Sequence, residues 1–269
     1  MKTLLTCAVI TASFLCSCGG NNAQKNEKGQ DVASVSQSTP LINELTDQEK
    51  SEGWQLLFDG KTTKGWRGAH KDAFPEYGWK VDNGMLIVLS SDGSESTNGG
   101  DIVTDGEYSA FELSVDFKIT EGANSGIKYF VTEQEKQKGS AYGLEFQILD
   151  DAKHPDAKLY TTYPGSRTLA SLYDLKKSEN VKFNGVGEWN TAVVKVFPNN
   201  HVEHWLNGVK VLEYERGSNE FRELKKGSKY AAAAYNDPTA FGEAPKGHIL
   251  LQDHGNEVAF RNIKIRPLN

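Results

Sequence analysis

Apolar and polar residues alternate in short runs along most of the chain. The clearest run extends from Phe111 to Ile119, where every second residue is apolar and the residues between are Glu, Ser, Asp and Lys. Because successive side chains of a strand point to opposite faces, this pattern predicts a strand with one buried and one solvated face. Further strands are expected over residues 54–58, 79–81, 85–88, 126–131, 142–149, 189–197, 204–206, 209–211, 248–253 and 258–266.

Turn residues separate several of these runs. Asp82-Asn83-Gly84 and Asn207-Gly208 each lie between two apolar runs, which is typical of tight hairpin turns. In the last run the apolar positions change parity between Phe260 and Ile263, which predicts a β-bulge.

Helix signals are few. A capping box begins at Thr46, and a second short helix is expected over residues 219–226, between Ser218 and Gly227. Many closely spaced strands with almost no helix indicate a sandwich or a barrel. We predict an all-β domain over residues 46–269: a jelly-roll sandwich of two antiparallel sheets, one of which curves to make a concave groove.

The N-terminal segment has the pattern of a lipoprotein export signal. A lysine precedes an apolar run over residues 4–15, which is too short to span a bilayer. The run ends in Leu15-Cys16-Ser17-Cys18, which is similar to the bacterial lipobox. Residues 1–17 are therefore expected to be removed and Cys18 acylated, with a plain signal peptide as the alternative. The acyl chains would anchor the protein to a membrane, in the periplasm or at the outer membrane. Residues 18–45 are small, polar and aperiodic, which predicts a flexible tether.

Composition excludes several function classes. The 36 acidic side chains outnumber the 30 basic ones, and no Lys/Arg cluster is present, so a nucleic-acid partner is not expected. All three cysteines lie in the first eighteen residues, which leaves the domain without a disulfide, a thiolate metal site or a cysteine nucleophile. The chain has no phosphate loop or dinucleotide fingerprint, so no nucleotide cofactor is expected, and it has no G-x-S-x-G motif.

The run over residues 143–151 carries the most informative polar side chains. Leu144, Phe146 and Ile148 share one strand face, so Glu145 and Gln147 point the other way, about 7 Å apart. These two form either a solvated outer face or the floor of the groove. A carboxylate beside an amide suits hydroxyl recognition or proton transfer.

A second strand and a turn offer similar groups. Gln252 and His254 share one face at the end of the run over 248–253, and a histidine there could act as a general base. The alternative for His254 is a structural role. Lys128 has the opposite parity to Ile127 and Tyr129, so it faces either the same groove or solvent.

A divalent cation is a further possibility. Asp150, Asp151 and His154 form an acidic turn with oxygen ligands, although their spacing is not that of an EF-hand. His201 and His204 lack metal-ligand spacing.

Short motifs over residues 53–268 together resemble the 3-keto-disaccharide hydrolase family. The matching segments are 53–60, 65–68, 79–86, 111–113, 122–127, 145–150, 171–174, 188–190, 207–208, 251–255 and 260–263. The resemblance implies a concanavalin-like jelly roll. It also implies an enzyme whose substrate is a glycoside already oxidised to a ketone at C3 of the sugar.

This substrate class dictates the chemistry that a site would need. The ketone makes the C2 proton acidic, and the glycosidic oxygen on C1 can then leave from the enolate. Water addition to the product completes a net hydrolysis. A base near C2, a hydrogen-bond donor or a cation near the C3 oxygen and an acid for the leaving oxygen are required. We assign proton transfer to Glu145 and His254, either of which could be the C2 base, and enolate stabilisation to Lys128. The other predicted substrate-binding residues are Arg67, Gln147, Asp150, Tyr173 and Gln252.

Two other functions are compatible with such a fold. A direct glycoside hydrolase needs a pair of carboxylates, but the positions after Glu145 on its strand face are Gln147 and Leu149. A non-catalytic sugar-binding lipoprotein would use exposed aromatic residues such as Trp66 and Trp205.

Overall fold

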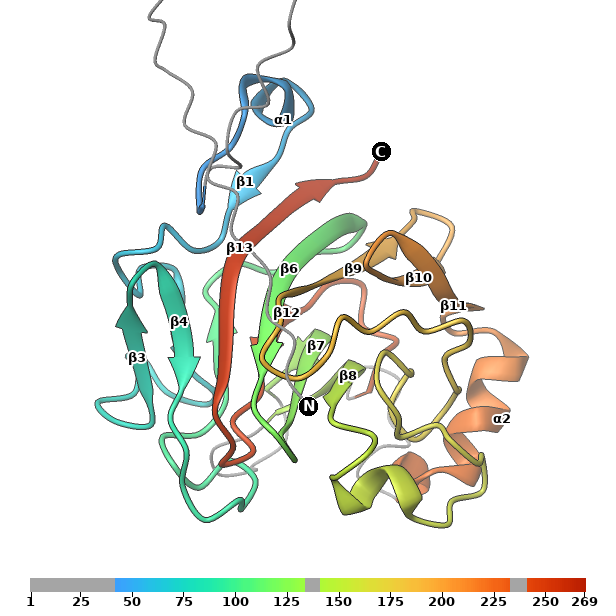
Figure 1. The fold of residues 1–269 in the computed structure, drawn as a ribbon. Coiled ribbons are helices and arrows are strands. Elements are labelled where there is room, and N and C mark those ends of the chain that lie inside the picture. Colours follow the sequence, from blue (N-terminus) through green and yellow to red (C-terminus); the bar gives the residue numbers. More distant parts are fainter. Residues whose placement is uncertain (1–41, 134–140, 233–240) are drawn as a thin grey trace, which may run out of the picture. The chain divides into compact units, whose positions relative to one another are not determined.

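Two antiparallel β-sheets pack face to face in the computed structural model, which describes residues 42–133, 141–232 and 241–269 (Figure 1). Sheet A has the strand order β11-β10-β9-β6-β13-β4-β3, with β1 also paired to β13. Its strands are β1 (Gln55–Leu56), β3 (Trp79–Asp82), β4 (Met85–Val88), β6 (Phe111–Ile119), β9 (Asn190–Val196), β10 (His201–Leu206), β11 (Val209–Glu215) and β13 (Val258–Pro267). The predicted jelly-roll sandwich is confirmed.

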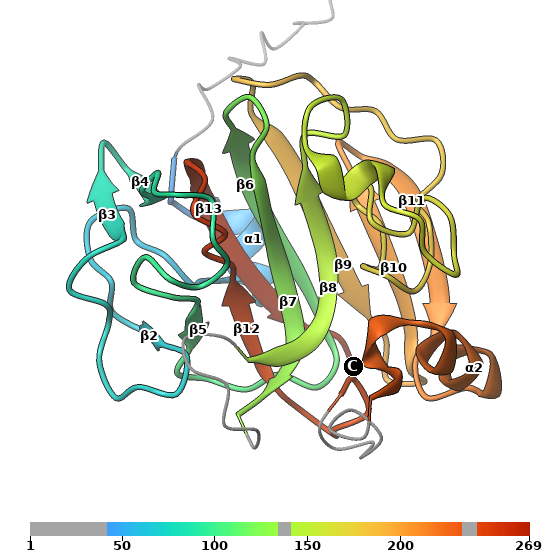
Figure 2. The ribbon, with the colours of Figure 1, turned by 90° about the horizontal axis from the view of Figure 1, so that it is seen from below.

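Sheet B is smaller and has the order β2-β5-β12-β7-β8, so β8 is an edge strand. Figure 2 shows these five strands side by side. They are β2 (Trp66–Gly68), β5 (Ile102–Thr104), β7 (Asn124–Thr132), β8 (Tyr142–Leu149) and β12 (His248–Leu251).

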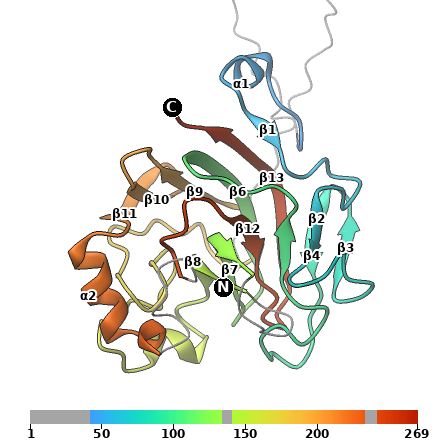
Figure 3. The same cartoon turned by 180° about the vertical axis from the view of Figure 1, so that it is seen from behind.

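The helices are short and lie outside the sandwich. They are α1 (Asp47–Ser51), η1 (Pro155–Lys158), α2 (Asn219–Gly227) and η2 (Lys229–Ala231). Thr46 caps α1 with the predicted capping box, and Ser218 caps α2. Figure 3 shows α2 beside β11 at one side of the sandwich. No helix among the described residues is long and apolar enough to cross a membrane.

The alternating run of β6 builds the centre of the core. Phe111, Leu113, Val115, Phe117 and Ile119 are all at most 1% exposed, and they pack against the inward side chains of sheet B. Burial of such side chains is the main favourable contribution to the fold.

The predicted turns and the predicted bulge are confirmed. Asn83 and Asn207 both have a positive φ and are followed by a glycine that also does, which matches the turn type that a two-residue hairpin needs. The register between β13 and β6 shifts between Arg261 and Lys264, where the apolar parity changes.

Three parts of the fold differ from the prediction. The strands β2 and β5 were not expected, because each is only three residues long and carries no alternation. The last residues assigned to the tether are anchored: Asn43 is 6% exposed and exchanges hydrogen bonds with Asn262. Trp66 is buried rather than exposed, and its indole N–H donates to the carbonyl of Leu57. The export signal, Cys18 and the tether up to residue 41 lie outside the described residues.

Candidate active site

Lys128 on β7 and Glu145 on β8 lie directly opposite one another in the antiparallel ladder. Their strand neighbours Ile127 and Phe146 pack in the core, so these two side chains face the outer side of sheet B. Both are nevertheless buried, with Lys128 6% and Glu145 4% exposed. The alternative interpretations, a solvated strand face for Glu145 and a solvated lysine at 128, are therefore wrong.

Two glutamines extend this outer face by one row. Gln147 lies opposite Gly126 in the ladder, and the backbone N–H of Gln252 donates to the carbonyl of Gly126. The side-chain nitrogens donate to the carbonyl of Arg167 (3.5 Å) and to Glu95 Oε1 (3.0 Å), respectively. The Oε1 atoms of both glutamines are buried without a hydrogen-bond partner among the described residues. Because buried polar atoms are normally paired, these two acceptors are suited to ligand hydroxyls.

Two carboxylates that the sequence did not point to neutralise Lys128. Its Nζ lies 3.5 Å from Asp101 Oδ2 and 4.0 Å from Glu95 Oε1. Asp101 is fully buried and also accepts hydrogen bonds from the backbone of Asp253 and the hydroxyl of Ser96, both at 3.0 Å. Glu95 lies at the surface, with its side chain 47% exposed.

These contacts give the two central groups opposite ionisation behaviour. Burial raises the pKa of Glu145 to about 7, although Lys128 and Lys229 act to lower it. Burial also acts to lower the pKa of Lys128, but Asp101, Glu145 and Glu95 raise it above its ordinary value. At neutral pH the site therefore holds a fixed ammonium beside a carboxyl group that can give or take a proton.

Tyr173 closes one side of this cluster. The segment 170–173 runs along the free edge of β8, where Tyr173 N–H donates to the carbonyl of Glu145 (3.1 Å). The Tyr173 hydroxyl donates to Asp156 Oδ2 (2.8 Å), and Arg167 bridges Asp156 (3.1 Å) and Asp174 (2.7 Å). Burial, with a contribution from the nearby Glu145, raises the pKa of Tyr173. Tyr173 thus lies beside Glu145.

His254 lies just beyond the end of β12. It is half-buried, and its ring meets that of His154 edge-on at a centroid distance of 5.8 Å. Its Nδ1 has no hydrogen-bond partner in the described part of the chain. The charge of His254 contributes to lowering the pKa of Glu95.

Two predicted binding residues are not brought into this cluster. Arg67 shares a cross-strand row with Lys128, but Val103 and Leu250 lie between them, which places the two residues about 14 Å apart at the usual strand spacing. Its guanidinium pairs with both carboxylate oxygens of Glu133, at 3.0 and 2.5 Å. Asp150 accepts backbone hydrogen bonds at the turns that end β8 and precede β7.

The comparisons with known proteins agree on one family. Residues 53–266 match the model of the 3-keto-alpha-glucoside-1,2-lyase-like domain. The chain belongs to this family. A 3-keto-disaccharide hydrolase of Bacteroides thetaiotaomicron is 34% identical over 286 residues, which cover 97% of this chain and 96% of the relative.

Two solved structures have the same fold. A "putative glycosyl hydrolase" of Parabacteroides distasonis aligns with a TM-score of 0.71 and 31% identity, over 85% of this chain and all of that one. A second protein described in the same words, from the same organism, gives a TM-score of 0.58 and 28% identity, over 80% of this chain and 99% of that one.

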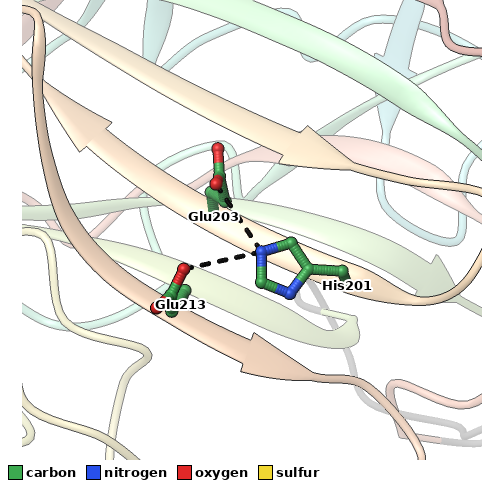
Figure 4. A group of neighbouring side chains, drawn as sticks. All are labelled: His201, Glu203 and Glu213. Carbon is green, nitrogen blue, oxygen red and sulfur yellow. Dashed lines mark ion pairs between the residues drawn. The ribbon is translucent and has the colours of Figure 1, made fainter.

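The turn considered for a cation does not present its ligand atoms together. Asp150 and Asp151 accept backbone N–H groups, the latter from Leu169 at 2.8 Å, and His154 Nδ1 accepts the N–H of Asp156 at 3.1 Å. Within the described ranges, the group with three ligand atoms within 4.8 Å of one another is instead His201, Glu203 and Glu213 on β10 and β11 (Figure 4).

That second group already holds a cation from the chain itself. His201 Nε2 lies 3.6 Å from both carboxylates, and Lys210 Nζ contacts the same two groups at 3.3 and 2.6 Å. Because the Lys210 ammonium already pairs with both carboxylates, we assign no metal to this group. The sequence did not reveal it, because Glu213 comes from the neighbouring strand.

The residues that sequence reasoning missed are Asp101, Glu95, Arg167 and Lys229. Glu95 and Asp101 lie in an irregular stretch between β4 and β5, where no periodicity relates them to a strand. Arg167 and Lys229 could be located only from the hydrogen bonds that position their segments.

Proposed function

We propose that this protein cleaves the glycosidic bond of 3-keto-glycosides, by elimination across C1–C2 followed by hydration. The family and the name of the Bacteroides relative support a substrate of this class. The observation that carries the proposal is the buried pair of Glu145 and Lys128 on neighbouring strands. Directly opposite residues of an antiparallel pair have their Cβ atoms about 5 Å apart.

Two neighbouring groups match two neighbouring atoms of the substrate. Elimination needs a base at the C2 proton and a positive charge at the C3 oxygen, which are attached to adjacent carbons. Glu145 has a pKa of about 7 because of its burial, so near neutral pH it is partly ionised and can accept a proton. Lys128 keeps its charge and can stabilise the enolate oxygen in a site of low dielectric.

The steps then follow in order. Glu145 removes the C2 proton, and the bonding electrons pass to the C3 oxygen beside Lys128. They return to form the C1–C2 double bond as the C1–O bond breaks and the departing oxygen takes a proton. Water addition places a hydroxyl on C1 and a proton on C2, which completes a net hydrolysis. The unpartnered Oε1 atoms of Gln147 and Gln252 are suited to accept sugar hydroxyls, and His254 is the second candidate for proton transfer.

A direct glycoside hydrolase is the second function to test. The argument against a carboxylate pair considered one strand only, and Asp101 and Glu95 approach Lys128 from another segment. Their electrostatic effect on Glu145 shows that acidic groups gather at this site. A glycosidase of this kind would not need the C3 ketone.

The test compares one glucoside in two oxidation states. Purified protein is incubated with 4-nitrophenyl 3-keto-glucoside and with 4-nitrophenyl glucoside, and both substrate and product are quantified by mass spectrometry. We expect consumption of the ketone only, a 2-hydroxy-3-keto-glycal intermediate, and a loss of about a hundredfold or more in Glu145→Gln. Turnover of the unoxidised glucoside would indicate a glycosidase. Binding without turnover of either compound would indicate a sugar-binding protein.

We also infer export and acylation at Cys18 from the motif Leu15-Cys16-Ser17-Cys18. Expression in a bacterial host with labelled palmitate should label the wild-type chain in the membrane fraction. Cys18→Ala should be unlabelled and soluble, whereas Cys16→Ala provides the matched control and should remain labelled. Equal labelling of both variants would refute acylation at Cys18.

A further inference from the structure

Lys229 presents an ammonium group at the edge of the candidate site. The residue is exposed, and its Nζ lies 4.3 Å above the centre of the Tyr173 ring. No carboxylate lies within 4.0 Å of this nitrogen in the part of the chain that the structure describes. Lys229 nevertheless interacts electrostatically with Glu145 and Glu95. It is therefore a cation that faces the site without a salt-bridge partner.

The backbone fixes Lys229 to the segment that carries Tyr173. Its N–H donates to Asp174 Oδ2 (2.7 Å), and the other oxygen of that carboxylate accepts from Arg167. The Ser228 hydroxyl caps the next turn by accepting from the N–H of Tyr230 (3.1 Å). Stacking of Tyr230 on Phe241, at a centroid distance of 4.0 Å, holds this turn against the domain.

The two lysines lie on opposite sides of Glu145. Lys128 belongs to β7, which pairs with one edge of β8, whereas Tyr173 hydrogen-bonds to the other edge at Glu145 itself. Tyr173 therefore lies on the side of Glu145 away from Lys128, and Lys229 lies over the Tyr173 ring. Across the site, the order of functional groups is therefore Lys128, Glu145 and then Lys229.

This order matches the order of the reacting atoms in the proposed reaction, on which the inference rests. With Glu145 at the C2 proton and Lys128 at the C3 oxygen, the C1 oxygen falls on the Lys229 side. We propose that Lys229 is the catalytic acid that protonates the departing C1 oxygen.

The proton and electron balance of the step is simple. The C1–O bond breaks, its electron pair stays on the departing oxygen, and that oxygen forms an O–H bond with a proton from the Lys229 ammonium. Glu145 gains the C2 proton, so the protein loses one proton and gains one. In the hydration step water gives its hydroxyl to C1 and its other proton to the exposed Lys229, and Glu145 returns its proton to C2, so both groups are reset and no other reactant is needed.

Neighbouring groups suit this role less well. Arg167 is held by two carboxylates and cannot release a proton at neutral pH. Lys229 is among the main charges that act on the pKa of Glu145, and His254 is not. The Tyr173 hydroxyl already donates a hydrogen bond to Asp156.

The test compares two substrates, one with a leaving group that must be protonated and one with a leaving group that departs as an anion. Lys229→Met is assayed with a 3-keto-disaccharide, whose alkoxide leaves poorly, and with 4-nitrophenyl 3-keto-glucoside, whose phenolate leaves without a proton. We expect kcat for the disaccharide to fall about a hundredfold or more, and kcat for the nitrophenyl compound to change less than about threefold. Exchange of the C2 proton in deuterated water, measured by NMR on recovered substrate, should persist in the variant.

Two further variants separate proton donation from charge and from folding. Lys229→Arg keeps the charge but cannot donate the proton, so it should show the same selective loss as Lys229→Met. Lys226→Met removes an exposed lysine of α2 that pairs with Glu223, and it should leave both activities unchanged. Thermal unfolding of each variant shows whether the domain remains folded.

Equal losses on both substrates, full activity in Lys229→Met, or restoration by arginine would overturn the assignment of Lys229. Absence of turnover and of C2 exchange in the unmodified protein would instead refute the proposed function itself. The two failures are therefore distinguishable.

Discussion

Gly126 leaves the space that the Glu145 side chain occupies. A Cβ atom at position 126 would lie 2.9 Å from Cδ and 3.0 Å from Cγ of Glu145, which is closer than such atoms normally approach. The glycine has an ordinary extended conformation, so its role is to leave room rather than to adopt an unusual φ. The absence of a side chain on β7 thus positions the carboxylate on β8.

Gly126→Ala should therefore displace Glu145 and reduce activity. We expect kcat on a 3-keto-glucoside to fall at least tenfold, because a misplacement of about 1 Å can cost a hundredfold. Gly68→Ala is the matched control on β2, where the added methyl meets the flexible side chain of Lys71 and should cost little. Similar kcat values for the two variants would show that the position of Glu145 does not limit turnover.

The raised pKa of Glu145 predicts a pH-dependent rate. If the carboxylate is the C2 base, only its ionised form is active, so kcat/KM should rise with pH through about 7 and then level off. Burial is the main cause of the raised pKa. Steady-state kinetics from pH 5 to 9 on a 3-keto-glucoside would locate the acid limb. A rate that falls over this range would exclude Glu145 as the base.

The same shift makes a prediction about stability. The native pKa of about 7 exceeds the ordinary value of 4.5, so the native state binds more protons than the unfolded state between these pH values. The wild type should therefore lose stability as the pH rises from about 4.5 to 7. Glu145→Gln lacks this titration and should gain stability relative to the wild type over that window. Glu121→Gln, at an exposed carboxylate, is the control for denaturant unfolding.

Asp101 raises the pKa of Glu145 through its negative charge. Asp101→Asn removes the charge while keeping an oxygen that can accept from Asp253 N–H and Ser96. The acid limb of the pH–rate profile should then move to lower pH. A fall in stability should accompany it, because Lys128 loses a buried ion-pair partner. An acid limb that stays in place or moves to higher pH would contradict the proposed coupling.

Periodicity in the sequence predicted the residues that lie on regular strands. Glu145, Gln147 and Lys128 were assigned to an outer face because their neighbours in β7 and β8 are apolar, and the structure bears out that parity. Hairpin turns followed from Asn–Gly pairs, because their backbone conformation is a local property.

Contacts that depend on irregular segments could not be predicted in this way. Arg67 has the parity of the correct face, but its strand occupies the far side of sheet B and its partner Glu133 follows β7. Strand order is set by tertiary packing, which no single run reveals. For the same reason Asp101 and Lys229, which contribute to the electrostatics of the site, could be found only from the fold.

His204, a buried residue of the core, provides a last prediction, which concerns stability as a function of pH. It is fully buried, with Nδ1 3.0 Å from the carbonyl of Ala170 and Nε2 2.8 Å from the Tyr129 hydroxyl. A carbonyl can only accept, so Nδ1 carries the proton of the neutral ring and Nε2 accepts from Tyr129. The N–H of Ala170 donates in turn to the carbonyl of Gln147.

Burial lowers the pKa of His204 from 6.5 to about 4, so the unfolded state binds more protons between these pH values. The contribution of the neutral histidine is fully present above pH 6.5 and is lost as the pH falls toward 4, by about 3 kcal/mol in total. His204→Gln should therefore be less stable than the wild type at pH 7, and the difference should shrink at pH 4.5. Urea unfolding at both pH values measures this difference, with His70→Asn as an exposed control. A difference that is the same at both pH values would mean that His204 does not titrate between them, since only a shifted pKa makes its contribution depend on pH.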